Sequence, residues 1–331
     1  MISDNLNRDQ EPFISILTPS WNRARHLENV WLGLLEQSYR NFEWIIANDG
    51  SEDNTVDVVK KLAAKSSFPV TLINASCRVG KSRIDNEAVA VASGDFIIWC
   101  DSDDCLMPDA LQTLIDAWDS IPFDQRKDFC GVTALCITEI GVLGNKFYNS
   151  TASIDLEWNE LFRKLGSDLV IFTKAELVKD NPFLEVDFLI PESSVWSVIG
   201  KRKTRFVPKV LKRVQYEAEN CLSFSGVMAY NRGYAHALAL SESGNRKSMS
   251  MAEKARRMVN YLRYCIHGDI GFKQAMDLWS AKPTKVLHFL LLLPFSVLLA
   301  LKDQLQGKVR KTHIDFEMAA KMAKINTHRL S

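Results

Sequence analysis

The sequence lacks the spaced cysteines and the apolar N-terminal segment that mark many zinc-binding and secreted proteins. None of its seven cysteines forms a Cys-x-x-Cys pair or lies in a Cys/His cluster with zinc spacing. Several lie inside apolar runs, which is typical of buried thiols in a reducing compartment. Residues 1–11 are polar and contain no apolar core of a signal peptide. We therefore expect a cytoplasmic protein.

An excess of charge of either sign is also missing. The chain of 331 residues carries 41 basic and 40 acidic residues, which removes any global electrostatic argument for a nucleic-acid partner. A local exception is the segment 201–213, which has seven basic residues and no acidic one. Such a segment can neutralise phosphates or an anionic membrane surface, although a solvated face is its usual interpretation.

The first hundred residues contain short apolar runs that alternate with amphipathic segments. Apolar runs rich in β-branched residues predict strands, and apolar residues at helical spacing predict the helices between them. The predicted strands cover 13–18, 42–47, 70–74 and 97–100, and the predicted helices cover 27–37, 55–64 and 85–92. This alternation is typical of an α/β fold with a doubly wound, mostly parallel central sheet.

The fourth predicted strand ends in three carboxylates within four positions, Asp101, Asp103 and Asp104. Ligands of an open α/β sheet bind beyond the carboxyl ends of its strands. Carboxylates gathered there repel one another unless a cation lies among them, and a hard divalent ion is the simplest candidate. The alternative is a solvated acidic turn before the helix predicted over 108–118.

A second motif suggests a different chemistry. Residues 75–82, Ala-Ser-Cys-Arg-Val-Gly-Lys-Ser, match a relaxed phosphate-binding P-loop between a predicted strand and a predicted helix. Three features oppose a P-loop nucleotidase: the first glycine is missing, the loop follows the third strand, and fewer than twenty residues separate Ser82 from Asp101. That interpretation also leaves Asp49, Asp103 and Asp104 without roles.

The second half of the chain is less regular and predicts an α+β region followed by helices. Strand-like runs occur at 129–140 and 170–173, and few strand signals follow residue 226. The segment 286–301 is almost wholly apolar and is flanked by lysines. Its sixteen residues fall short of the roughly 20 that span a membrane. We expect a helix at the membrane interface, with a buried hairpin as the alternative.

Several short motifs follow one another with suitable gaps. They are Ile-Leu-Thr-Pro-Ser-Trp-Asn-Arg (16–23), Leu-Glu-Gln-Ser-Tyr-Arg-Asn-Phe-Glu-Trp-Ile-Ile (35–46), Asn-Asp-Gly-Ser-Glu-Asp-Asn-Thr (48–55), Asn86, Ala-Ser-Gly-Asp (92–95), Asp-Ser-Asp-Asp (101–104) and Met-Pro-Asp (107–109). Together they resemble the family 2 glycosyltransferases of GT-A fold. The resemblance covers about residues 12–120 and extends more weakly to about 225.

The resemblance implies a nucleotide-diphosphate sugar donor, most often a UDP-sugar, and single displacement with inversion. By position in the motifs, Pro19, Asn22 and Asp49 are expected to line the nucleoside pocket. Asp101 is expected near the ribose or the metal, and Asp103 is expected to bind Mg²⁺ or Mn²⁺ together with the diphosphate. Asp104 is left for local structure.

A general base is expected in the second half, where the family often has an acidic residue shortly before a tryptophan. Glu192 fits in Pro-Glu-Ser-Ser-Val-Trp (191–196), although Ser193 replaces the second acid of the commonest pair. Asp187 and Glu185 are the alternatives. Trp196 is either a wall of the acceptor pocket or part of the core. Arg205, Lys209 and Arg213 either contact phosphate of the donor or of a lipid-linked acceptor, or are solvated surface residues.

The sequence thus predicts a GT-A domain over 1–225, with a nucleotide-binding half at about 12–120 and an acceptor half at 121–225. Residues 226–331 form a helical, membrane-associated extension. The expected enzyme transfers a sugar to a saccharide or lipid-linked acceptor at the inner face of the cell membrane, in the assembly of a surface polysaccharide or glycolipid. A catalytically silent sugar-nucleotide-binding or scaffold protein of the same fold is the alternative.

Overall fold

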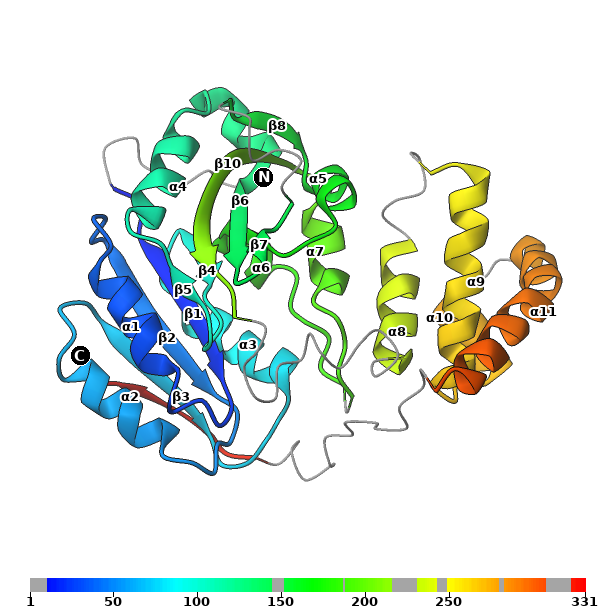
Figure 1. Ribbon diagram of the computed structural model, residues 1–331, viewed down its shortest axis with the longest axis horizontal. Helices are drawn as coiled ribbons and strands as arrows, with labels where there is room; N and C mark the ends of the chain where they lie inside the picture. Colours follow the sequence, from blue (N-terminus) through cyan, green and yellow to red (C-terminus); the bar gives the residue numbers. More distant parts are fainter. Residues whose placement is uncertain are drawn as a thin grey trace. The chain divides into compact units, whose positions relative to one another are not determined.

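The computed structural model describes residues 11–144, 152–186, 188–215, 231–242, 249–279, 283–307 and 323–331 (Figure 1). Within these residues the chain divides into two compact units. The first comprises residues 1–182, 199–219 and 318–331, and the second comprises 183–198 and 220–317. The domains predicted over 1–225 and 226–331 stay a prediction, and the two units differ from them in that residues 183–198 belong to the second unit and residues 318–331 to the first.

One eleven-stranded sheet forms the centre of the first unit, in the order β11-β3-β2-β1-β4-β9-β6-β10-β5, with β7 and β8 added beside β6 and β10. Its strands are β1 (Ile14–Ser20), β2 (Phe42–Asn48), β3 (Val70–Ala75), β4 (Phe96–Trp99), β5 (Cys105–Leu106), β6 (Phe129–Thr138), β7 (Gly141–Val142), β8 (Ile154–Glu157), β9 (Leu169–Lys174), β10 (Lys203–Arg213) and β11 (Ile325–Arg329). Strands β3, β2, β1 and β4 are mutually parallel, whereas β9 runs antiparallel to β4 and β6. The predicted α/β class with a mostly parallel sheet is confirmed.

The helices of the first unit connect these strands. They are α1 (Leu27–Leu35), α2 (Thr55–Ala63), α3 (Lys81–Val91), α4 (Ala110–Asp119), the 3-10 helix η1 (Phe123–Asp128), α5 (Trp158–Leu165) and α6 (Ala175–Lys179). The helix predicted to start at Pro108 begins instead at Ala110, because Asp109 has a φ of 59° and cannot belong to a right-handed helix.

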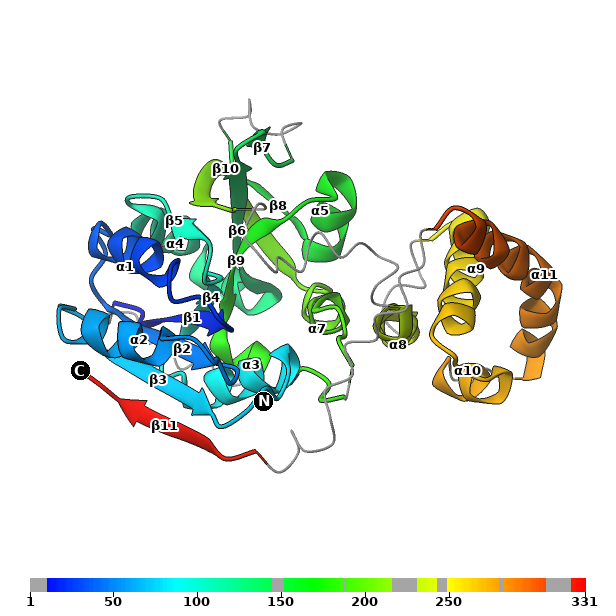
Figure 2. The same cartoon turned by 60° about the horizontal axis from the view of Figure 1, so that its bottom comes forward.

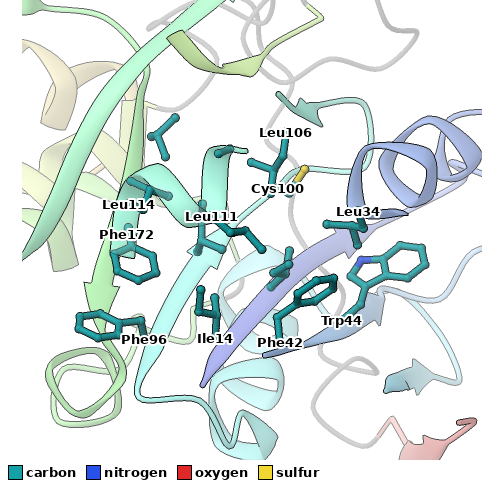
Figure 3. Close-up of a cluster of buried hydrophobic side chains, with 14 of the residues drawn as sticks. Ile14, Leu34, Phe42, Trp44, Phe96, Cys100, Leu106, Leu111, Leu114 and Phe172 are labelled. Atoms are coloured by element: carbon teal, nitrogen blue, oxygen red, sulfur yellow. The ribbon is translucent and has the colours of Figure 1, made fainter. Parts of the chain in front are cut away.

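Aromatic and aliphatic side chains from these strands and helices form the core of the first unit (Figure 3). Phe96 of β4 stacks on Phe172 of β9 with ring centroids 4.4 Å apart, which joins the two halves of the sheet. Trp44 Nε1 donates to Thr18 Oγ1 at 2.9 Å, and Thr18 Oγ1 donates to the Cys100 carbonyl at 2.8 Å. These bonds fix the end of β4, after which the three carboxylates begin.

Residues 203–213 of the basic segment form β10, which is only partly a solvated face. Alternate side chains of a strand point to opposite faces, so its charges divide between solvent and the interior. Lys209 and Arg213 are exposed, Lys212 is buried, and Arg205 pairs with Asp155 of the neighbouring β8 through bonds of 2.8 and 2.7 Å. The sequence pattern did not reveal these partners because they lie about fifty or more positions away.

Strand β11 pairs antiparallel with β3 along the outer edge of the sheet, where it is the red strand in Figure 2. Lys324 also exchanges hydrogen bonds with Ser76, just after β3, and Leu330 N donates to the Val70 carbonyl at 2.8 Å. The last residues therefore cover the edge of β3, which would otherwise present unpaired backbone groups.

The second unit is helical, as predicted, and contains α7 (Ser193–Ile199, except its last residue), α8 (Asn231–Glu242), α9 (Met251–His267), α10 (Phe272–Leu278) and α11 (Pro283–Leu305). Its core gathers Tyr261, Trp279 and Phe289. A Cβ on Gly233 would lie 2.0 Å from the Leu189 carbonyl oxygen, so α8 packs directly on the segment before α7. This contact places residues 188–190 within the helical unit.

Candidate functional site

The carboxyl ends of β1, β2 and β4 bring together the loops that carry most of the predicted site residues. The three strands are adjacent and parallel, with Ser20 opposite Asn48 and Leu17 opposite Trp99, so their following loops share one edge of the sheet. Pro19 lies in β1 and is half-buried, and Asn22 and Asp49 follow β1 and β2. The sheet thus gathers Pro19, Asn22 and Asp49 at the edge where ligands of such folds bind.

The Asp49 carboxylate is buried and oriented by the loop between β3 and α3. Its Oδ1 accepts hydrogen bonds from the backbone N–H of Val79 at 2.6 Å and of Gly80 at 3.0 Å. Burial raises the pKa of Asp49, while these two N–H groups and Arg78 oppose that rise. Gly50 has a φ of 65°, and a Cβ there would lie 2.2 Å from the Cys77 carbonyl carbon. Only glycine lets the two loops approach this closely.

This arrangement does not support the P-loop alternative. The Val79 and Gly80 N–H groups, which a P-loop would direct at phosphate, point at Asp49. Lys81, in the position of the P-loop lysine, pairs with Asp85 at 2.8 Å. Asp49 therefore uses the donors that the alternative requires.

Asn22 connects the loops after β1 and β2. It has a left-handed backbone with a φ of 53°, its N–H donates to Ser51 Oγ at 2.8 Å, and its Oδ1 accepts from Glu52 N at 2.9 Å. The residue before Asn22, Trp21, lies under the Arg78 guanidinium, whose central carbon is 3.7 Å from the centroid of the Trp21 ring. The sequence gives no sign of this contact, because Trp21 and Arg78 lie on loops more than fifty residues apart.

The three carboxylates after β4 have separate surroundings. Asp104 is buried and its Oδ2 lies 2.7 Å from Lys212 Nζ of β10, so it forms an internal ion pair. Asp103 Oδ2 lies 3.5 Å from Arg23 Nη2, and both side chains are only slightly exposed. Burial and the Asp101 charge raise the pKa of Asp103, against the effect of Arg23. Asp104 thus supports the loop, while Asp103 lies beside the Arg23 guanidinium and near the charge of Asp101.

These residues fit a divalent ion that is bound together with a phosphate ligand. Among the residues that the structure describes, no three His, Cys, Asp or Glu side chains gather closely enough to hold a metal by themselves. Mg²⁺ sites of phosphate-transferring enzymes commonly use one or two carboxylates, with phosphate and water as the other ligands. Asp103, with Asp101 beside it, provides this kind of incomplete oxygen site.

Glu192 belongs to the second unit and is half-buried at the start of α7. Its backbone carbonyl accepts from Val195 N at 2.9 Å, and its Oε2 lies 3.5 Å from Trp196 Nε1. Trp196 is buried against the Phe183 ring, as the core interpretation expects. Glu185 is exposed, and Asp187 lies outside the described residues. Glu192 thus belongs to a different unit from Asp101 and Asp103, and its role as a base stays a prediction.

Comparison with known proteins gives the same family as the motifs. The model of the family described as "Glycosyl transferase family 2" matches residues 15–163. The chain is 25% identical over 205 residues to a GalNAc(5)-diNAcBac-PP-undecaprenol beta-1,3-glucosyltransferase of Campylobacter jejuni, a match that covers 61% of this chain and 64% of that protein.

Two groups of solved structures have the same fold. Residues 1–349 of S. aureus TarS, in complex with UDP-GlcNAc, align with a TM-score of 0.56 and 16% identity, over 90% of this chain and 84% of that chain. The mannosyltransferase PcManGT of Pyrobaculum calidifontis, in complex with GDP-Man and Mn²⁺, aligns with a TM-score of 0.53 and 17% identity, over 89% and 88%. At these identities the likeness concerns the fold.

Proposed function

We propose that this protein transfers a sugar from a UDP-sugar to a hydroxyl group of a saccharide or lipid-linked acceptor, with inversion and with Mg²⁺ or Mn²⁺, because residues 15–163 match the model of glycosyl transferase family 2. The observation that carries the proposal is the placement of Asp49 after β2 and of Asp101 and Asp103 after β4, at the carboxyl ends of two strands that flank β1 and run parallel to it. The metal-bound and nucleotide-bound neighbours of the same fold support it. The name of the C. jejuni relative supports a lipid-linked acceptor.

Each residue has a distinct task in this mechanism. Asp49, held by the loop after β3, accepts a hydrogen bond from the base, and Pro19 and Asn22 shape the nucleoside pocket. Asp103, with Asp101, would hold the divalent ion, which when bound would supply Lewis-acid stabilisation of the leaving diphosphate. Glu192 takes the proton of the acceptor hydroxyl while the oxygen of that hydroxyl bonds to the anomeric carbon of the donor sugar. The bond from that carbon to the diphosphate breaks on the opposite face, which inverts the configuration.

A screen of sugar nucleotides tests this proposal directly. A donor that binds only the native state raises the melting temperature of the protein. The increase grows with the ratio of the donor concentration to its Kd. We expect UDP and at least one UDP-sugar to stabilise the protein in the presence of Mn²⁺, and the same donor to release UDP slowly by transfer or hydrolysis. Binding without release from any donor would favour the silent scaffold.

We also propose that α11 attaches the enzyme to the membrane surface. The helical segment 286–305 is long and apolar enough to cross a membrane, and only 22% of its most apolar 18-residue stretch is buried. One face of α11 packs inward through buried residues, Phe289, Ser296, Ala300 and Asp303. The opposite face exposes apolar residues at helical spacing, Leu287, Leu291, Phe295, Leu298, Leu301 and Leu305.

The inner face of α11 favours an interfacial position over a spanning one. Asp303 Oδ1 accepts from Arg263 Nη2 at 2.5 Å, and Asp303 Oδ2 lies 3.1 Å from His267 Nε2. A spanning helix would separate Asp303 from these partners on α9 and place a charge near hydrocarbon, which is costly. A helix that keeps α9 on one face and inserts its leucines on the other avoids this cost. The exposed Lys302, with Lys282, Lys285 and Lys308 in the sequence, matches anionic headgroups.

Leu298→Glu is expected to weaken binding to vesicles of anionic phospholipid at least tenfold, because it places a charge in the inserted face. Co-sedimentation with the vesicles measures the effect. Ile140→Glu is the matched control, since Ile140 is 91% exposed in the first unit. Equal vesicle binding by Leu298→Glu and the parent would contradict the attachment. Truncation is unsuitable as a test because it would also remove β11 from the sheet.

A further inference from the structure

The backbone of Arg23 is fixed, beside the candidate donor site, by hydrogen bonds to the segment after β2. The segment after β1 is fastened to the loop after β2 through three consecutive N–H groups. The bonds are Asn22 N to Ser51 Oγ at 2.8 Å, Arg23 N to Thr55 Oγ1 at 3.1 Å and Ala24 N to Asp53 Oδ2 at 3.2 Å. The position of Arg23 is therefore set by the fold of both loops.

The Arg23 side chain crosses from this segment to the loop after β4. Its Nη2 lies 3.5 Å from Asp103 Oδ2, and the exposed fractions of the two side chains are 11% and 13%. With so little water between them, the two charges interact strongly. The free protein thus has a fixed cation beside the carboxylate that is proposed to hold the metal.

We propose that Arg23 opposes the binding of the divalent ion alone and favours its binding together with the nucleoside diphosphate. This inference rests on the proposed function of Asp103. A divalent ion that approaches Asp103 meets the positive guanidinium, which also competes for the carboxylate. A diphosphate brings negative oxygens, which a guanidinium binds well through paired N–H groups. Released from Asp103, the Arg23 side chain then contacts the diphosphate.

The consequence is a positive coupling between metal and nucleotide. Each ligand raises the affinity of the other by the same factor, because the coupling free energy is reciprocal. Arg23 increases this factor, since the metal draws Asp103 away from Arg23 and thereby frees the guanidinium for phosphate. Donor and metal therefore enter the site as one unit, and a metal-loaded site without a donor is rare.

Arg23→Gln provides a test with two opposite effects. We expect the affinity for Mn²⁺ alone, measured by the electron paramagnetic resonance of free Mn²⁺, to rise about tenfold. We expect the affinity for UDP in saturating Mn²⁺, measured by calorimetry, to fall about tenfold. Arg23→Lys should lie between the parent and Arg23→Gln, because an ammonium keeps the charge but not the paired donors. Arg25→Gln, an equal charge change on an exposed side chain two residues away, should change neither affinity more than twofold.

A general loss of structure would lower both affinities and would therefore overturn the inference, as would an unchanged affinity for Mn²⁺ alone. A parent protein that binds UDP equally with and without Mn²⁺ would instead overturn the metal assignment itself. Opposite changes in Arg23→Gln, together with Mn²⁺-dependent UDP binding by the parent, would support both.

Discussion

Asp103→Ala is expected to lower the Mn²⁺-dependent affinity for UDP at least 100-fold. Loss of a residue that only supports a metal ligand commonly costs 10–100-fold in affinity, so loss of the ligand itself should cost as much or more. In this protein the substitution also leaves the nearby Arg23 without the carboxylate that lies 3.5 Å from its guanidinium. Calorimetric titration of UDP with and without Mn²⁺ measures the change.

Two comparisons give this result its meaning. The affinity for UDP without Mn²⁺ should not fall in Asp103→Ala, because Asp103 is proposed to act on the nucleotide through the metal. Asp57→Ala removes an equal charge from an exposed position on α2 and should behave as the parent. If Asp103→Ala retains the full response to Mn²⁺, the metal assignment is wrong.

The first four strands could be predicted because their signal is local. Each is a short run of apolar residues that becomes buried on both faces of a parallel sheet, and such runs need no knowledge of distant partners. The observed strands β1, β2, β3 and β4 agree with the predicted ones within two residues at each end. The helices between these strands fit the parallel arrangement, because a parallel neighbour must be reached through a crossover.

The charged contacts could not be predicted because their partners are distant in sequence. Lys212 belongs to a segment that resembles a solvated basic face, and only the pairing of β10 with β5 shows that its ammonium meets Asp104. Arg23 belongs to a recognisable motif, yet its contact with Asp103 joins two loops 80 positions apart. The residue type limits what chemistry a side chain can perform, but the arrangement of strands and loops determines which charged group lies next to it.

The last strand shows a similar limit. Residues 325–329, Ile-Asn-Thr-His-Arg, are mostly polar and exposed, so they lack the apolar run that predicts a buried strand. They form a strand because the edge of β3 offers unpaired backbone groups, and backbone pairing depends little on side chains. The sequence predicted only helices after residue 226 because this partner lies some 250 positions earlier.

Glu192→Gln is expected to reduce sugar transfer about a thousandfold while leaving Mn²⁺-dependent UDP binding within twofold of the parent. General-base catalysis contributes typically 10²–10⁴-fold, and a glutamine amide cannot take the proton of the acceptor hydroxyl. The substitution is nearly isosteric, and the amide oxygen can still accept from Trp196 Nε1, which lies 3.5 Å from the Glu192 carboxylate. The start of α7 should therefore keep its structure, and an unchanged melting temperature would verify that.

The comparison with two other acidic residues decides which group is the base. Glu185→Gln alters an exposed carboxylate nearby and should retain transfer, whereas Asp187→Asn alters the nearest alternative in the sequence. Full sugar transfer by Glu192→Gln would contradict the assignment of Glu192 as the base. Loss of transfer in Asp187→Asn would then assign that role to Asp187. Loss of transfer with retained UDP binding in Glu192→Gln alone would identify Glu192 as the base. The substitutions of Asp103 and Glu192 would then have separate effects, the first on Mn²⁺-dependent donor binding and the second on transfer, as expected for a metal ligand and a proton acceptor.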